Sequence, residues 1–479
     1  MEDKLREAGI LLPLFSLPGT LGIGDMGSCV FDWLDLLHCS GVASWQILPL
    51  HPVGYSNSPY QTYSAFAGDE IYICIEDLFL ECGLDCDVDK VVCDSVDYDE
   101  VRLIKNKFLR SAYQSFKPDN QYHEFVKNTK WLKEYAIFMA LRKTNNYQAW
   151  IDWSISEYDH NEVDYQMFLQ YIFIKQWIKI KNYANAKDIK IIGDIPIYLS
   201  HDSAELYFHK EMFLLNSDNT LKVSAGVPPD YFSKEGQYWG NPIYDWQALK
   251  VDNYQLWIDR FKWAQKLFDV IRIDHFRAFD TYWVIDANAN SAVNGNWHFG
   301  PSYDFFDHIY QKLPNIEIIV EDLGNLRDDV LKLRDHYQLM GMQIIQFTLD
   351  PHEIKKDQNM RDNLLLYTGT HDNEVLVDWF KQQSLLKKLK LRWHLWLCGI
   401  KDRNLIDKTI HYTLSLRANW AILPLQDITQ ISNSRINRPG SVGYPNWQWK
   451  LKDLDQTKIG LDKLKKWLQQ TNRIRSKDK

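Results

Sequence analysis

Four segments of the sequence end in polar side chains that could do chemistry. The stretch VIRIDHFRAF at 270–279 begins like a buried strand, yet it carries Arg272 and Asp274, with His275 directly after them. Successive side chains of a strand alternate between faces, so Arg272 and Asp274 point the same way at the strand's end. Three other apolar runs end in comparable groups: Asp194 in GDIP, Glu321 and Asp322 in EDLG, and His371 and Asp372 in GTHDN.

Three reaction classes use such a ring of carboxylates: metal-assisted chemistry, glycoside transfer, and proton abstraction beside a carbonyl. A polar residue after a strand end can instead cap the next helix, and Asp322 or Asn325 could do so after EDLG. The arginine on its own face predicts that Asp274 is held ionised. Glu321 follows the apolar run IEIIV, so we expect its pKa to be raised. Opposite environments for two carboxylates favour double displacement on a glycoside over a divalent-metal site.

Eight short apolar runs could position these residues as the strands of one sheet. Helical patterns lie between them, for example at 28–41, 253–268 and 326–338, which is typical of a parallel sheet. Eight such units predict an α/β fold of the (β/α)8 TIM-barrel class, whose catalytic mouth lies at the C-terminal strand ends. The alternative is an open doubly wound sheet, but its nucleotide-binding versions lose support because no GxGxxG directly follows an early strand and no GxxxxGK[ST] motif occurs. The predicted strands are 9–15, 43–50, 190–199, 268–276, 316–324, 342–350, 363–373 and 419–427.

Two connections in this pattern are longer than a simple βα repeat needs. We expect one catalytic barrel over residues 1–479, with large helical and loop insertions after strands 2 and 3 at approximately 55–186 and 199–252. The stretch at 224–246 has the composition of a loop, and its glycines and prolines suit a lid. After NWQWKLKDLD only helices are expected, so no C-terminal β-sandwich domain is predicted.

Composition excludes several function classes. The net charge of −8 and the pI near 6.0 argue against a nucleic-acid partner. Seven cysteines without a CxxC pair argue against a disulfide framework or a zinc site. A cytoplasmic protein without a membrane partner is expected, because the sequence contains neither a secretory leader pattern nor a run of 18 apolar residues. Aromatic residues make up 14% of the chain, which suits a surface that stacks on sugar rings.

The ordered motifs of the chain give a family resemblance. The sequence resembles the amylomaltases, or 4-α-glucanotransferases, which are the disproportionating enzymes of glycoside hydrolase family 77 in the α-amylase superfamily. The resemblance runs from SLPGTLGIGDMG at 16–27 to RINRPGSVGYPNWQW at 435–449. Its motifs, in order, are SPYQTYSAFAG (58–68), GDIPIYLSHDSAE (193–205), AGVPPDYFSKEGQYWGNP (225–242), RIDHFRAF (272–279), EDLG (321–324) and GTHDN (369–373).

The resemblance implies residue roles in a retaining transfer. Asp274 resembles the nucleophile, Glu321 the general acid and base, and Asp372 the third carboxylate, which binds the 2- and 3-hydroxyls of the distorted sugar. The other residues that the resemblance places against the sugar chain or beside the nucleophile are Ser58, Tyr60, Asp194, Gln237, Trp239, Arg272, His275, Phe347, His371 and Asn437.

The resemblance also implies substrates and leaves alternatives open. It implies transfer of 1,4-α-glucan segments between maltooligosaccharides, with glycogen or starch-type glucans as donors and glucose as an acceptor. Neither a metal nor a cofactor is expected. One alternative is an α-1,4-glucan hydrolase of the same superfamily, and another is a glucan-binding protein without catalysis. Arg277 has no predicted role.

Overall fold

Eight parallel strands form the centre of the protein. In the computed structural model, which describes residues 6–229, 234–289, 291–324, 326–351, 354 and 360–473, they pair in the order β10-β11-β12-β1-β2-β3-β6-β9. The ring closes between β9 and β10, where Val320 N–H donates to the Met340 carbonyl at 2.8 Å. The strands are β1 (Glu7–Leu11), β2 (Ser44–Gln46), β3 (Lys190–Ile195), β6 (Val270–Ile273), β9 (Ile318–Val320), β10 (Gly341–Ile344), β11 (Leu364–Tyr367) and β12 (Trp420–Pro424).

All eight predicted strands are therefore present and in the predicted order, and the TIM-barrel prediction is confirmed. Side chains alternate between the two faces of these strands, and apolar residues pack on both faces of the sheet. Inward-facing Ile192, Val270 and Ile319 join one cluster inside the barrel, whereas Ile271 and Ile273 face the surrounding helices. Two residues further along their strands the inward positions become polar, and this change marks the mouth of the barrel.

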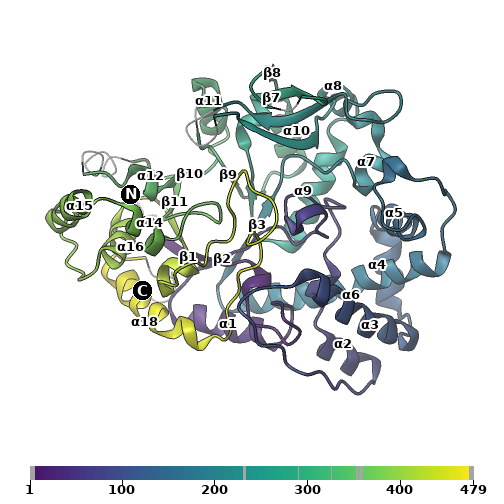
Figure 1. Ribbon diagram of the computed structural model, residues 1–479, viewed down its shortest axis with the longest axis horizontal. Coiled ribbons are helices and arrows are strands. Elements are labelled where there is room, and N and C mark those ends of the chain that lie inside the picture. Colours follow the sequence, from purple (N-terminus) through teal and green to yellow (C-terminus); the bar gives the residue numbers. More distant parts are fainter. Residues whose placement is uncertain are drawn as a thin grey trace.

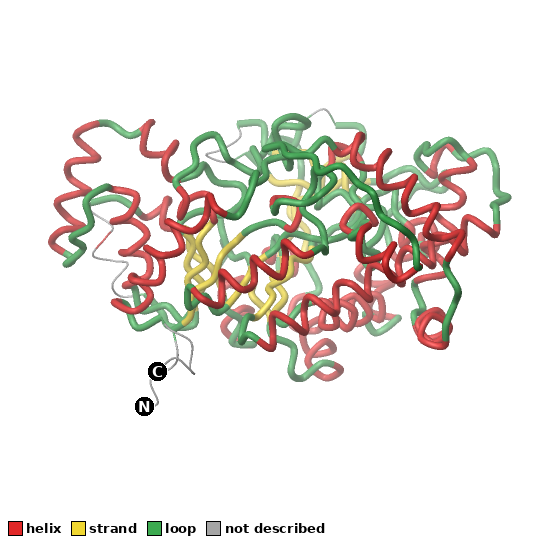
Figure 2. The backbone as a smooth tube through the Cα atoms, turned by 90° about the horizontal axis from the view of Figure 1, so that it is seen from below, coloured by secondary structure: helices red, strands yellow, loops and turns green. Residues whose placement is uncertain are grey.

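Helices surround the barrel (Figures 1 and 2). The predicted helical patterns at 28–41, 253–268 and 326–338 correspond to α1, α9 and α11. The helices nearest the barrel strands in sequence are α1 (Ser28–Cys39), α9 (Gln255–Leu267), α10 (Ser302–Lys312), α11 (Asp328–His336), α12 (Ile345–Thr348), α14 (Leu376–Gln382), α15 (Leu385–Leu397), α16 (Leu405–Ser415), α17 (Leu425–Thr429) and α18 (Asp455–Gln470). None of the described helices is long and apolar enough to cross a membrane.

The chain between β2 and β3 is mainly helical and packs to one side of the barrel (Figure 1). It contains α2 (Ile75–Cys82), α3 (Tyr98–Ser115), α4 (Asn120–Asn128), α5 (Leu132–Thr144) and α6 (His160–Ala186). The side chain of Asp159 caps the start of α6. On α6, Gln170 exchanges two hydrogen bonds of 2.8 Å with the backbone of Gly68, and Gln176 pairs in the same way with Cys74. These pairs anchor the segment after β2, which carries the SPYQ motif, to a long buried helix.

A second sheet stands over one side of the barrel mouth, and the sequence did not predict it. It is antiparallel, in the order β5-β4-β7-β8, and its strands are β4 (Val223–Val227), β5 (Gln237–Pro242), β7 (Thr281–Asp286) and β8 (Asn296–Phe299). The segment between β3 and β6 also contains α7 (Ala204–Phe208) and α8 (Trp246–Val251). The prediction of a loop at 224–246 was thus wrong for β4 and β5, because prolines and glycines between two short strands hid the alternation.

The first barrel strand pairs with the last. β1 lies parallel to β12, with Gly9 opposite Ile422, and β2 lies on its other side. Arg473 fastens this seam: its buried guanidinium donates to backbone carbonyls that include Glu7 at 3.0 Å and Ala418 at 2.8 Å. Residues separated by more than 400 positions therefore hold one edge of the barrel together.

Candidate active site

Arg272 occupies the floor of the barrel mouth. It is the third residue of β6, and it lies in register with Asp194 of β3. Its Nη1 contacts Asp194 Oδ2 at 2.6 Å and Asp274 Oδ1 at 3.2 Å, and its Nη2 lies 3.2 Å from Glu321 Oε2. The Arg272 side chain is 3% exposed, whereas those of Asp274 and Glu321 are 28% and 26% exposed. One buried cation therefore orients two carboxylates that remain open to a ligand.

A chain of hydrogen bonds leads from this floor to the opposite wall of the mouth. The Tyr60 hydroxyl donates to Asp194 Oδ2 at 2.8 Å and lies 3.1 Å from His371 Nε2. Because the tyrosine proton is directed to the carboxylate, His371 Nε2–H must be the donor to the tyrosine oxygen. The Tyr60 and His371 rings stack with centroids 5.4 Å apart, and Trp447 packs against both.

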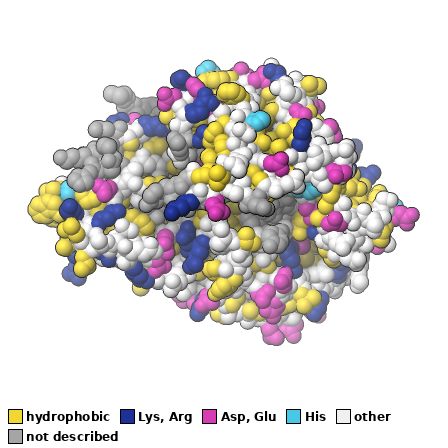
Figure 3. All heavy atoms as spheres, turned by 45° about the horizontal axis from the view of Figure 1, so that its top comes forward, with side chains coloured by type: hydrophobic (Ala, Val, Ile, Leu, Met, Phe, Trp, Pro, Cys, Tyr) yellow, Lys and Arg dark blue, Asp and Glu magenta, His cyan; other side chains and the backbone are white. Residues whose placement is uncertain are grey.

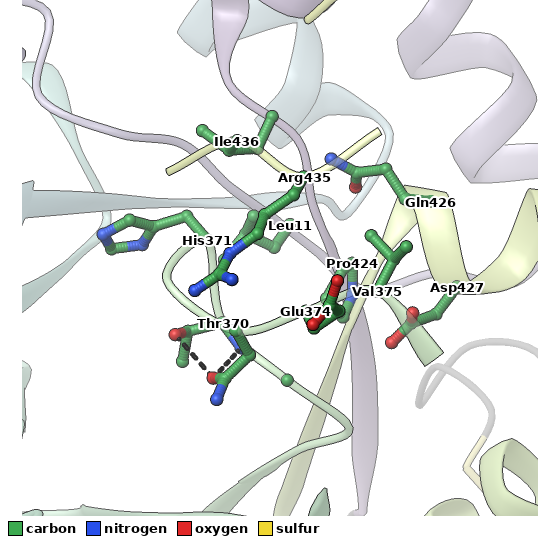
Figure 4. Close-up of a pocket in the computed structure, with 12 residues that line it drawn as sticks. Leu11, Thr370, His371, Glu374, Val375, Pro424, Gln426, Asp427, Arg435 and Ile436 are labelled. Carbon is green, nitrogen blue, oxygen red and sulfur yellow. Dashed lines mark hydrogen bonds between the residues drawn. The ribbon is translucent and has the colours of Figure 1, made fainter. Parts of the chain in front are cut away.

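The GTHDN segment forms a tight turn that presents Asp372. The Asn373 side chain accepts hydrogen bonds from the backbone N–H and the hydroxyl of Thr370, as the dashed lines in Figure 4 show. Asn437 donates to Asp372 Oδ1 at 2.7 Å, and the Arg435 guanidinium donates to the Asp372 carbonyl. In Figure 4, Arg435 extends over Thr370. The turn and the 435–437 segment therefore hold a carboxylate that is 44% exposed.

A buried aspartate clamps the base of the same turn. Asp427 of α17 accepts hydrogen bonds from the Thr368 hydroxyl at 2.6 Å and from Leu376 N–H at 2.7 Å, so it joins both ends of the segment that carries His371 and Asp372. It lines the pocket beneath the turn, opposite Arg435 (Figure 4). Burial raises the pKa of Asp427 to about 7.

The backbone after β6 turns sharply to bring His275 against Glu321. His275 adopts the left-handed conformation with φ 52°, which is uncommon for a residue with a side chain. In this position its N–H donates to Glu321 Oε2 at 2.9 Å, and its ring makes an edge contact with Trp239 at 5.0 Å. The Trp239 indole N–H in turn donates to the side chain of Gln237 at 3.1 Å. The strand β5 thus places Trp239 against His275, with Gln237 bonded to Trp239.

The carboxylates of Asp274 and Glu321 interact directly, and this changes the predicted pKa assignment. Burial, followed by repulsion from Glu321, raises the pKa of Asp274 well above its usual range. Burial also acts to raise the pKa of Glu321, but Arg272, Asp274 and the His275 N–H together lower it to about 2. The expectation of a low pKa for Asp274 and a raised one for Glu321 is therefore reversed, because Arg272 reaches both groups and Glu321 alone accepts the backbone N–H. When the pair binds a single proton, these directions place that proton on Asp274.

Burial also sets the protonation of the polar groups around the pair. It lowers the pKa of His275 to about 4, so the imidazole is neutral at pH 7. Burial and the nearby Asp194 raise the pKa of Tyr60 well above its usual range, so the phenol keeps its proton. Both groups can therefore act as uncharged hydrogen-bonding partners of a sugar.

Several predicted residues lie at the edge of this network. Ser58 bonds locally, because its hydroxyl accepts from the Tyr60 N–H at 3.3 Å and thereby shapes the turn before Tyr60. Phe347 lies on α12, directly after β10, and 52% of its surface is exposed. Arg277 packs over the Trp297 ring at 3.8 Å and so contacts the second sheet.

The cap alternative was wrong for Asp322, although its role is structural, and Asn325, the other candidate cap, lies outside the described residues. Asp322 accepts a hydrogen bond from Met342 N–H at 2.7 Å and forms an ion pair with Arg334 at 2.6 Å. Its carboxylate therefore faces β10 and α11 and links them where the barrel closes. Sequence reasoning also missed Arg435 and Trp447. Both lie inside the RINRPGSVGYPNWQW motif, and that position was the one signal that could have marked them.

Comparison with known proteins decides between the reaction classes that such a ring allows. A family profile described as 4-alpha-glucanotransferase, Glyco_hydro_77, matches residues 12–457. The chain belongs to this family. A 4-alpha-glucanotransferase of Clostridium butyricum is 40% identical over 465 residues, which cover 91% of this chain and 95% of the relative. One from Synechocystis is 36% identical and covers 94% of each chain. The enzyme is thus a 4-alpha-glucanotransferase that acts on α-1,4-glucans.

Solved structures agree with this assignment. The amylomaltase of Streptococcus agalactiae, solved in complex with acarbose, superposes with a TM-score of 0.93 at 32% identity and covers 98% of this glucanotransferase and 100% of that chain. The amylomaltase of Corynebacterium glutamicum shares the fold, with a TM-score of 0.79 at 17% identity. The barrel with its covering elements is therefore an amylomaltase fold over almost the whole chain.

Proposed function

We propose that the enzyme transfers glucan segments by a retaining double displacement in which Asp274 is the nucleophile and Glu321 the acid and base. The observation that carries this proposal is the single guanidinium of Arg272, which contacts both carboxylates at 3.2 Å. The two carboxyl groups also interact directly with each other, so they lie too close to leave room for a water molecule on the far face of the sugar, which an inverting reaction would need. Their closeness supports attack by one carboxylate and protonation by the other.

This division of roles requires one proton on the pair, located on Glu321 when the sugar reacts. In the first step the bond between Asp274 and the anomeric carbon forms as the bond to the leaving 4-oxygen breaks, and Glu321 gives its proton to that oxygen. In the second step the acceptor 4-hydroxyl gives its proton to Glu321 and displaces Asp274. One proton on two carboxyls is the number that this cycle requires. The pKa directions place it on Asp274, so a sugar bound between the groups must shift it to Glu321.

The surrounding residues are proposed to bind the sugar chain. Asp372 would take the 2- and 3-hydroxyls of the reacting sugar, with His371 and His275 as further hydrogen-bonding partners and Tyr60 stacked against the ring. Asp194 and Arg272 would hold these side chains in position from the floor of the barrel mouth. Contacts further along the chain and the exclusion of water are proposed for Ser58, Gln237, Trp239, Phe347 and Asn437.

The finer biological assignments remain proposals of the same kind. The donors would be maltooligosaccharides and glycogen or starch-type glucans, and glucose would serve as an acceptor. The enzyme would act in the cytoplasm. The segments at 55–186 and 199–252 would be insertion subdomains of one catalytic barrel over residues 1–479.

A donor that needs no acid tests the two roles separately. The fluoride ion of α-maltosyl fluoride leaves without being protonated. Glu321→Ala should therefore form the covalent adduct from this donor, while its rate on maltotriose falls by about 100-fold or more. Peptide mass analysis should place the adduct on Asp274, and Asp274→Ala should form none. An adduct on another carboxylate, or equal losses on both donors in Glu321→Ala, would contradict the assignment. With maltotriose, the wild-type enzyme should give glucose and longer glucans at a nearly constant number of reducing ends.

A further inference from the structure

Helix α15 carries an unusual surface for a protein of this charge. Its sequence is LLKKLKLRWHLWL, and six large apolar side chains on it are more than half exposed: Leu385, Leu386, Leu389, Trp393, Trp396 and Leu397. Only Leu391 and Leu395 are buried against the rest of the molecule. Scattered exposed leucines are ordinary, but six on one short helix form a contiguous patch.

The exposed apolar residues share a single face of the helix. At about 100° per residue, the positions 385, 386, 389, 393, 396 and 397 fall within roughly 120°, and the face centred on them points away from Leu391 and Leu395. The two indole rings lie nearly parallel, with centroids 5.3 Å apart and an interplanar angle of 24°, so they extend the leucine face as a flat plate.

Basic side chains flank this apolar face on both sides. On the same wheel Lys387, Lys390 and His394 lie along one border, and Lys388 and Arg392 lie along the other. The sequence from 379 to 401 contains six Lys or Arg residues and no Asp or Glu, although the whole chain has a net charge of −8. The patch is therefore locally cationic in an anionic protein.

The helix lies at the outer end of the molecule. Figures 1 and 2 place it far from the second sheet, and at the corresponding end of Figure 3 apolar side chains gather beside basic ones. Contact between two copies through this face would bring their like-charged borders together, which is unfavourable. A neutral glucan would leave the cationic borders unused.

We propose, in contrast to the expectation from the sequence that the protein has no membrane partner, that α15 docks the enzyme on the surface of an anionic lipid bilayer. A helix with Leu and Trp on one face and Lys and Arg along its borders is the arrangement that lies in the interface of a membrane, where the apolar face enters the acyl boundary and the cations meet the phosphates. The cytoplasmic leaflet is negatively charged, so it supplies the complementary surface. The helix rests on the bilayer and does not span it.

Flotation with lipid vesicles tests the proposal on the full chain. Wild-type enzyme should float with vesicles of phosphatidylcholine containing about one third phosphatidylglycerol and should stay behind with pure phosphatidylcholine. The double variant Leu389→Glu, Trp393→Glu should lose binding by on the order of 100-fold. The variant Lys388→Glu, Arg392→Glu should lose most of the binding at low salt. Both should disproportionate maltotriose at the wild-type rate, which shows that they fold.

A matched control separates this face from exposed apolar residues in general. Leu80 and Val251 are 79% and 85% exposed on other helices, and the variant Leu80→Glu, Val251→Glu should float like the wild type. Several results would overturn the proposal: wild-type enzyme that stays behind, equal binding to neutral vesicles, or unchanged binding in Leu389→Glu, Trp393→Glu. So would a dimer in sedimentation velocity that this variant abolishes, or binding to a single-stranded RNA as tight as to the vesicles.

Discussion

Replacing Arg272 should damage stability and catalysis through different partners. Arg272→Met removes the cation that contacts Asp194, Asp274 and Glu321 and keeps a side chain of similar length. Asp194 is fully buried, and without Arg272 it keeps the Tyr60 hydroxyl as its remaining described partner. Removing one member of a buried ion pair costs about 3–5 kcal/mol, so we expect the free energy of unfolding to fall by that amount.

The catalytic loss should exceed what this destabilisation explains. Without the guanidinium, Glu321 loses its largest stabilising charge, and the two carboxyls no longer have a common partner. We expect kcat on maltotriose to fall by about 100-fold or more, which corresponds to about 2.7 kcal/mol. Arg272→Lys keeps the charge but places it at one point, so it should restore part of the stability and little of the rate.

A second-site variant makes the reasoning refutable. Adding Asp194→Asn to Arg272→Met removes the unpaired buried charge, so unfolding in urea should return to within about 1 kcal/mol of the wild type while kcat stays low. If Arg272→Met unfolds like the wild type, the buried pair does not contribute as described. If the double variant regains activity, Arg272 acts only by holding the fold.

Three further predictions concern Asp274 and the turn that carries Asp372. The kcat/KM profile should fall on the alkaline side as pH rises through the raised pKa of Asp274, because the shared proton is then lost, and a profile without this limb would contradict the shared proton. Asn437→Ala frees Asp372 from a 2.7 Å hydrogen bond and should lower kcat/KM about tenfold with an unchanged unfolding transition; an unchanged kcat/KM would assign Asn437 a packing role. Asp427 has its pKa raised to about 7 by burial, so the folded wild type loses a bound proton and up to about 4 kcal/mol of stability as pH rises from 4 to above 7. In Asp427→Asn this loss should vanish. The difference between the free energies of unfolding in urea at pH 5 and at pH 8 should therefore differ from that of the wild type, and an equal difference would refute the prediction.

The sequence predicts the barrel well because the relevant signals are local. Strands such as β9 are short, wholly apolar and followed at once by polar residues, so both the strand and the position of Glu321 could be read from the chain. The second sheet was missed because β4 and β5 are separated by prolines and glycines and read as a loop. Gln237 and Trp239 were still found, since their motif marks them whatever the backbone does.

Electrostatics could not be predicted in the same way. Whether Arg272 contacts one carboxylate or two depends on where β9 places Glu321, and this is a property of the closed ring and not of either strand. The left-handed His275 that gives Glu321 its backbone donor is equally invisible in the sequence. Strand alternation predicts that Glu321 and Asp322 point in opposite directions, but the hydrogen bond that Asp322 accepts from Met342 N–H appears only once β10 is in place.

The pairing of the first barrel strand with the last determines when, relative to translation, the barrel can close. β1 needs β12, and the arginine that fastens their seam is Arg473. At 5–20 residues per second a ribosome takes roughly 20–80 s to pass from β1 to β12. During that time one edge of β1 is without its final partner, so the barrel can close only after nearly the whole chain has been made. The enzyme should therefore complete its fold after translation rather than strand by strand as it emerges.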